Sequence, residues 1–302
     1  MTDLSGIWVA LVTPFLNPPL SPAHSQSAGQ GVDHRSLRSL IAHLRDAGVT
    51  GLVALGSTGE PSALDDAEQD AVLDTVLDAA QGLPVIAGLA GNHVGHLHAR
   101  LAHLNTLPLH AVLSPAPYYV RPSQAGLITH FQALADASRA PLVLYDIPYR
   151  TGVQMALDTL LTLAAHEHIV GIKDCGGSID KTQQLIADGR LQVLSGEDAL
   201  IFHNLCLGGA GAITAAAQVA PREFMALYQA LRQGQLAPAR ELQHRLAPLM
   251  RSLFAEPNPM LVKAELARQG LALPHVRPPF LAASPGAAQA VEADMRALAS
   301  GS

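Results

Sequence analysis

The chain has 302 residues, of which 49% are hydrophobic and 15% are charged, so it holds enough apolar material for a large core and is not a disordered protein. Its formal net charge is −6, aromatic residues make up 4%, and no basic run is interleaved with aromatics, which excludes a nucleic-acid-binding surface. The two cysteines, Cys175 and Cys206, are too few for a disulfide scaffold. The N-terminal segment has neither a basic region nor a long apolar stretch, so we expect no signal peptide or membrane span and a cytoplasmic protein.

Eight short apolar runs rich in Val, Ile and Leu recur along the chain, and a segment with helical periodicity follows each of them. Nearly continuous apolarity is typical of parallel strands that are covered on both faces. The expected strands span residues 6–15, 51–57, 84–90, 110–116, 141–148, 169–175, 191–196 and 211–216. The expected helices span residues 34–47, 65–80, 94–106, 123–138, 154–165, 180–187, 198–206 and 221–233, and Asp65 with Glu68 forms a capping-box pattern at the start of the second.

Eight β–α repeats in about 230 residues match a (β/α)8 barrel, because an open doubly wound sheet normally has fewer strands. We therefore predict an α/β protein with a TIM barrel over residues 1–234. Residues 235–302 carry no strand signal and form a predicted C-terminal helical region, with helices at 236–254, 258–270 and 286–299. The Pro-, Ser- and Gly-rich segment at 17–31 is expected to be a long mobile loop.

The active site of such a barrel lies at the carboxyl ends of its strands. Lys173 stands there inside the apolar run IVGIKDC (169–175). A buried lysine has a lowered pKa, so more of it is the free amine that attacks a carbonyl to form a Schiff base. The structural alternative is a lysine whose head reaches solvent or pairs with Asp174 or Glu197, and the sequence alone does not separate the two.

Two other strand ends carry groups suited to the same chemistry. The turn GSTGE (56–60) offers two hydroxyls and several amide N–H groups for a small carboxylate, although an ordinary glycine-rich turn has the same composition. Tyr145 could relay protons near an imine, or it could be a core tyrosine with a satisfied hydroxyl.

The chain resembles the dihydrodipicolinate synthase / N-acetylneuraminate lyase family of pyruvate-dependent class I aldolases. The resemblance covers almost the whole chain. It rests on GSTGE (56–60), PYYVRPSQAGL (117–127), YDIPYRTG (145–152), GIKD (171–174), LSGED (194–198), GGAGAI (208–213) and EPNP (256–259), in that order.

The resemblance implies that Lys173 forms the Schiff base with pyruvate and that Tyr145 transfers protons, with no separate cofactor and no metal. It implies that Ser57 and Thr58 hold the pyruvate carboxylate and link the phenols, and that Tyr119 crosses from a neighbouring subunit. Further substrate-binding roles fall on Gly59, Arg150, Gly196 and Ile213. A homotetramer built as a dimer of dimers is the implied assembly.

Arg150 is the residue that says most about the identity of the second substrate. Pro-x-Arg-Thr-Gly is the pattern of the synthases, in which the arginine binds the carboxylate of L-aspartate 4-semialdehyde, and residues 148–152 match it. The implied reaction gives 4-hydroxy-tetrahydrodipicolinate, in lysine and diaminopimelate biosynthesis. A surface arginine paired with an acid is the structural alternative.

Several positions depart from the synthase pattern. Ser57 replaces a usual threonine, Asp146 a usual asparagine, Val120 a usual polar residue and Pro61 a small polar one. A sugar-acid or 2-oxo-acid aldolase, similar to N-acetylneuraminate lyase or 2-keto-3-deoxygluconate aldolase, therefore stays an alternative, as does a non-catalytic barrel that binds an oxo acid.

The histidines near residue 96 bear on metal binding and on regulation. Of the histidines at 93, 96, 98 and 103, only His96 and His103 share a helical face, so we expect solvated histidines and no metal site. Many synthases bind lysine as an inhibitor beside an asparagine and a tyrosine, which match Asn92 and Tyr118 here. The acidic residue of that site is replaced by His96, so we predict weak or absent inhibition by lysine, with Asp66 the one acid that could compensate.

Overall fold

Eight strands follow one another in sequence order around a closed barrel in the computed structural model, which describes residues 2–16 and 31–300. The predicted TIM barrel is therefore confirmed. The strands are β1 (Gly6–Ala10), β2 (Gly51–Ala54), β3 (Val85–Gly88), β4 (Ala111–Pro115), β5 (Leu142–Asp146), β6 (Ile169–Asp174), β7 (Gln192–Ser195) and β8 (Gly211–Thr214), each within a run expected from the sequence.

Helices alternate with these strands as predicted. They are α1 (His34–Asp46), α2 (Asp66–Ala80), α3 (Val94–Leu104), α4 (Gln124–Ala137), α5 (Pro148–Thr151), α6 (Leu157–Leu163), α7 (Ile179–Asp188), α8 (Ile201–Cys206) and α9 (Pro221–Arg232). The capping box at the start of α2 is present, because Asp65 accepts from the Glu68 N–H and the Glu68 carboxylate accepts from the Asp65 N–H. No helix among residues 2–16 and 31–300 is long and apolar enough to cross a membrane.

Two expectations differ from the structure near β5. The short helix α5 begins two residues after the strand, at the end of the expected strand 141–148, and no helix was expected before residue 154. The next helix begins at Leu157 instead of residue 154, because the N–H groups of Met155 and Ala156 donate to the side chains of Asp146 and Gln124. The segment at 17–31 that we expected to be a mobile loop lies outside the described residues, except for Gly31.

The chain divides into two compact units. Unit 1 comprises Met1–Gly6 with Pro84–Ile213, and unit 2 comprises Ile7–Leu83 with Thr214–Ser302. In unit 1, strands β3 to β7 pair in parallel with their sequence neighbours. Gly171 allows close packing in β6, since a Cβ there would lie 2.6 Å from Leu4 Cδ1 and 2.8 Å from the Gln192 carbonyl oxygen.

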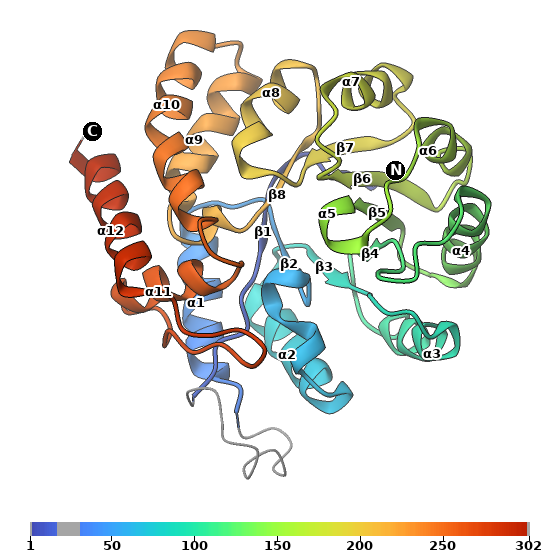
Figure 1. The fold of residues 1–302 in the computed structure, drawn as a ribbon, viewed down its shortest axis with the longest axis horizontal. Helices are drawn as coiled ribbons and strands as arrows, with labels where there is room; N and C mark the ends of the chain where they lie inside the picture. Colours follow the sequence, from blue (N-terminus) through green and yellow to red (C-terminus); the bar gives the residue numbers. More distant parts are fainter. Residues whose placement is uncertain (1, 17–30, 301–302) are drawn as a thin grey trace. The chain divides into compact units, whose positions relative to one another are not determined.

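Unit 2 contains the parallel pair β1–β2 and the C-terminal helices α10 (Leu236–Leu253), α11 (Met260–Arg268) and α12 (Pro285–Ser300). Figure 1 shows α10 beside α9 and α12, in agreement with the contacts between these helices. The three helices match those predicted after residue 235. The assignment of residues 235–302 as a region separate from a barrel at 1–234 stays a prediction.

Candidate active site

Lys173 and Tyr145 lie side by side on neighbouring strands of unit 1. They are register partners on β6 and β5, and the Lys173 Nζ atom lies 4.5 Å from the centroid of the Tyr145 ring. Each residue is 6% exposed. Burial lowers the pKa of Lys173, against the opposing influence of Cys175, Asp198 and Glu197. A larger fraction of this side chain is therefore the neutral, nucleophilic amine at a given pH.

The alternative in which Lys173 pairs with Asp174 or Glu197 is not observed. The Asp174 carboxylate accepts from the Gly176 N–H at 2.8 Å and from the Thr182 hydroxyl at 2.6 Å. Glu197 accepts from the Tyr149 hydroxyl at 3.1 Å. Among the described residues of unit 1, no carboxylate lies within ion-pair distance of Lys173.

The chain has only two other lysines, and both are in buried ion pairs. Lys181 Nζ lies 2.5 Å from Asp146 Oδ2, and Lys263 Nζ lies 2.5 Å from Glu60 Oε1. Each of these two amines has a carboxylate at ion-pair distance, whereas the acids that oppose the pKa shift of Lys173 make no ion pair with it among the described residues.

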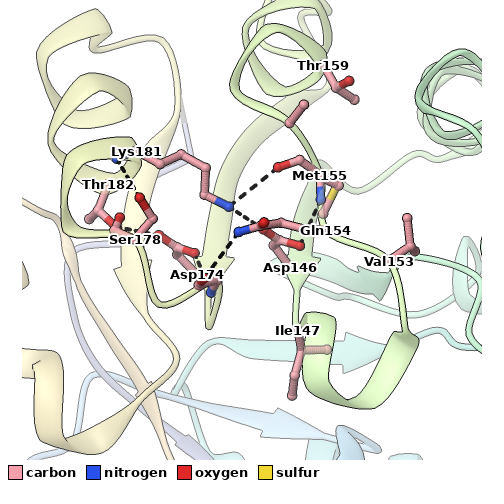
Figure 2. Close-up of polar contacts among 12 residues, drawn as sticks. Asp146, Ile147, Val153, Gln154, Met155, Thr159, Asp174, Ser178, Lys181 and Thr182 are labelled. Carbon is pink, nitrogen blue, oxygen red and sulfur yellow. Dashed lines mark hydrogen bonds and ion pairs between the residues drawn. The ribbon is translucent and has the colours of Figure 1, made fainter.

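Figure 2 shows the Lys181 side chain extending toward Asp146 and Met155. Successive side chains of a strand point to opposite faces, so Asp146 and Asp174 point away from the side that carries Tyr145 and Lys173. There Lys181, from α7, donates to Asp146 and, at 3.4 Å, to the Met155 carbonyl oxygen. Asp146 is fully buried, and burial raises its pKa even though Lys181 opposes the shift.

The turn GSTGE follows β2 in unit 2. Residues Ser57–Gly59 form a single 3-10 turn, and the Thr13 hydroxyl donates to the Gly59 carbonyl oxygen at 2.7 Å. Thr58 is 3% exposed, and its Oγ1 accepts from the Asn258 Nδ2 at 2.8 Å. Glu60 ends the turn in the left-handed region with φ of 53°.

The remaining predicted residues of unit 1 occupy strand ends and the loops after them. Arg150 is exposed in α5, and Ile213 is fully buried in β8. Gly196 follows β7, where a Cβ would lie 2.9 Å from Lys173 Cε, so glycine makes room for the lysine stem. Tyr119 is 88% exposed with φ of 70°, and its N–H donates to the Thr151 carbonyl oxygen.

Comparisons with known proteins match the chain over nearly its whole length. The model of the Dihydrodipicolinate synthetase family matches residues 3–298. A 4-hydroxy-tetrahydrodipicolinate synthase from Methanopyrus kandleri is 37% identical over 282 residues, 92% of this chain and 91% of that protein. One from Neisseria meningitidis is 36% identical over 297 residues, covering 97% and 98%. The solved structure of the synthase from Methylacidiphilum fumariolicum superimposes with a TM-score of 0.91 at 31% identity, covering 99% of this chain and 97% of that one.

This chain belongs to the dihydrodipicolinate synthetase family. The family identified from the sequence motifs and the enzyme type that it implies, a class I aldolase, are thereby confirmed.

Three further residues near Lys173, namely Cys175, Tyr149 and Glu197, were not among the site residues expected from the sequence. Cys175 is 4% exposed, and burial raises the pKa of its thiol. Its Sγ lies close to Gly196, since a Cβ added to that glycine would be 2.3 Å from the sulfur. Tyr149 is 67% exposed, but its hydroxyl donates to Glu197, and desolvation of that hydroxyl, with Cys175 and Glu197 adding to it, raises the pKa of the phenol. All three stand within three residues of the end of a strand, β6, β5 and β7 respectively, and this position is the sequence signal that could have identified them.

Metal-ligating side chains do not gather in the part of the chain that the structure describes. Among these residues, no group of three or more His, Cys, Asp or Glu side chains is arranged to hold a metal ion. Near the N-terminus of α3, the side chain of His93 accepts from the His96 N–H and so caps the helix.

Proposed function

We propose that this chain condenses pyruvate with L-aspartate 4-semialdehyde through a Schiff base on Lys173 and gives 4-hydroxy-tetrahydrodipicolinate, the compound in the names of its curated relatives. The observation that carries the proposal is the state of Lys173. It is the one lysine of the chain with no carboxylate within ion-pair distance among the described residues of its own unit, and its pKa is lowered by burial. A related structure from Acinetobacter baumannii, 31% identical with a TM-score of 0.91, is described as complexed with pyruvate.

The proposed chemistry needs no separate cofactor. The neutral Nζ of Lys173 attacks the carbonyl carbon of pyruvate, and loss of water leaves an imine. Loss of a proton from the pyruvate methyl group gives an enamine, whose carbon attacks the aldehyde carbon while the aldehyde oxygen takes a proton. The amine of the semialdehyde then attacks the imine carbon, which closes the ring and releases Lys173. Tyr145, beside the amine, is the group that we assign to these proton transfers.

Substrate-binding roles follow the family motifs. Ser57, Thr58 and Gly59 are proposed to bind the pyruvate carboxylate, with Gly196 and Ile213 as further binding residues. Arg150 is proposed to bind the carboxylate of the semialdehyde, because a guanidinium forms paired hydrogen bonds with a carboxylate.

We further propose that Tyr119 completes the site of a neighbouring subunit within a homotetramer in the cytoplasm. The exposed Tyr119 ring, on a backbone with positive φ, supports the contact. One structural relative is described as the first monomeric dihydrodipicolinate synthase variant, so the assembly of this chain needs its own measurement by sedimentation.

Borohydride trapping tests the proposal. Incubation with pyruvate and borohydride is expected to add one reduced pyruvyl group, which peptide mapping places on Lys173, and Lys173→Ala is expected to abolish the adduct. A retained adduct in that variant would overturn the assignment. A panel of aldehyde acceptors then separates the synthase from the alternative aldolases. Turnover of a sugar acid without turnover of the semialdehyde would favour one of the alternative aldolases.

A further inference from the structure

Polar contacts join the C-terminal helical region to the turn after β2 within unit 2. Asn258 stands just before α11, and its Nδ2 donates to Thr58 Oγ1 at 2.8 Å in a buried contact. Lys263, within α11, pairs with Glu60 of the same turn. Both contacts connect residues about 200 positions apart in the sequence, as the separations of 200 and 203 show.

The Asn258 contact has a defined direction. An amide nitrogen carries protons and has no lone pair to offer, so the Thr58 hydroxyl can enter this contact only as an acceptor. Its single proton therefore points away from Asn258. The other amide atom, Asn258 Oδ1, is buried without a hydrogen-bond partner among the described residues. Only the donor side of this asparagine is used.

The backbone of the turn is fixed independently of Asn258. The Glu60 carboxylate accepts from Lys263 Nζ and, at 2.9 Å, from the Arg277 N–H. Lys263 also donates to the His275 carbonyl oxygen at 2.8 Å. On the other side of the turn, Thr13 donates to the Gly59 carbonyl oxygen. Because these contacts hold the backbone of the turn, the main effect of Asn258 is on the orientation of the O–H bond of Thr58.

We propose that Asn258 is a positioning residue that keeps the Thr58 hydroxyl as a hydrogen-bond donor toward the pyruvate carboxylate. This inference rests on the proposed function, in which Thr58 binds that carboxylate. The C-terminal helical region then contributes to substrate binding without touching the substrate.

Asn258→Asp is the decisive variant, because it keeps the side-chain shape and replaces the donor by an ionised acceptor. The Thr58 proton would turn to the introduced carboxylate, and pyruvate would lose a donor. We expect the pyruvate concentration for half-maximal borohydride adduct to rise about 10- to 100-fold, with little change in the rate at saturating pyruvate. Lowering the pH should reverse much of the rise, since a protonated carboxyl can donate again.

Two further variants separate this role from a merely structural one. Asn258→Ser frees the Thr58 hydroxyl without capturing its proton, so we expect a rise of only a few-fold. In a Thr58→Ala background, Asn258→Asp should have little further effect on half-saturation, because the group through which it acts is gone.

The matched control is Asn204→Asp. Asn204 is also buried, its Nδ2 donates to the carbonyl oxygens of Val193 and Gly211, and its Oδ1 has no hydrogen-bond partner among the described residues. Neither of these two hydrogen bonds involves a hydroxyl group, so we expect Asn204→Asp to lower the melting temperature and to leave half-saturation by pyruvate unchanged.

Equal effects of Asn258→Asp and Asn258→Ser on half-saturation, or a loss of maximal rate at unchanged half-saturation, would overturn the proposal and leave Asn258 structural. A wild-type protein that forms no adduct with pyruvate would instead refute the proposed function, and this inference with it. Circular dichroism confirms that each variant is folded, and Asn258→Ser with the Thr58→Ala cycle keeps the test decisive if Asn258→Asp does not fold.

Discussion

Removing the ammonium group of Lys181 is expected to destabilise the protein strongly. Lys181→Met keeps an apolar side chain of similar length but removes the ammonium group that pairs with the fully buried Asp146 carboxylate. The Met155 N–H, at 3.2 Å, then remains as a hydrogen-bond donor to Asp146. The Asp174 carboxylate is its register partner on the neighbouring strand. Breaking a buried pair in this way costs about 3–5 kcal/mol. That is a large share of the roughly 5–15 kcal/mol by which a typical domain is stable.

The pairing itself is tested by removing both charges. Asp146→Asn retains an acceptor for the Met155 N–H, and the double variant Asp146→Asn with Lys181→Met leaves no buried charge at this pair. We expect the double variant to lie within about 1–2 kcal/mol of wild type, so that it is more stable than Lys181→Met alone.

Urea unfolding at pH 7, followed by circular dichroism, measures these free energies. The deficit of Lys181→Met should also shrink as the pH falls. Burial raises the pKa of Asp146 in the folded state, so protonation at lower pH favours folding and relieves the unpaired charge. A loss of less than about 1 kcal/mol in the free energy of unfolding of Lys181→Met would refute this expectation. So would a double variant whose loss equals the sum of the losses of the two single variants.

Three further predictions concern activity and its control. Because the pKa of Lys173 is lowered, the rate of borohydride trapping with pyruvate should rise with pH and level off below the ordinary pKa of a lysine side chain. A rate that still increases around the ordinary lysine pKa would show that the Lys173 amine is unperturbed. Arg150→Ala should leave pyruvate trapping intact and raise KM for aspartate semialdehyde about 10- to 100-fold, measured by steady-state kinetics, and an unchanged KM would remove Arg150 from that role. Millimolar lysine should inhibit little at pH 8, and His96→Glu should gain inhibition; strong saturable inhibition of the wild type would contradict this.

The regular elements were predictable because each depends on local sequence. Strands covered on both faces read as continuous apolar runs, and the Asp65–Glu68 cap is a pattern of four residues. The late start of α6 was not predictable in the same way. It depends on Asp146 and Gln124 taking the N–H groups of Met155 and Ala156, and these partners are up to 32 residues away.

The same distinction applies to the site. Lys173 and Tyr145 could be placed together because both stand at the ends of consecutive parallel strands, whose register then makes them neighbours. The pairs Asp146–Lys181 and Thr58–Asn258 join residues 35 and 200 positions apart. A single sequence carries no periodic signal for such pairs, so the side-chain geometry was needed to find them.

The three lysines of the chain illustrate why composition alone could not single out Lys173, the lysine that we propose to be reactive. All three are buried, at 6%, 7% and 0% exposure for Lys173, Lys181 and Lys263. Burial disfavours the charged form of each amine, and what differs is the partner. Asp146 and Glu60 accept hydrogen bonds from the other two amines in buried ion pairs, and Glu60 opposes the burial that lowers the pKa of Lys263 to about 8. Both Lys173 and Lys263 lie over an aromatic ring, Tyr145 and Phe15 respectively, but only Lys263 has a carboxylate at ion-pair distance as well. The absence of such a carboxylate among the described residues of its unit is what supports the proposed nucleophilic role of Lys173.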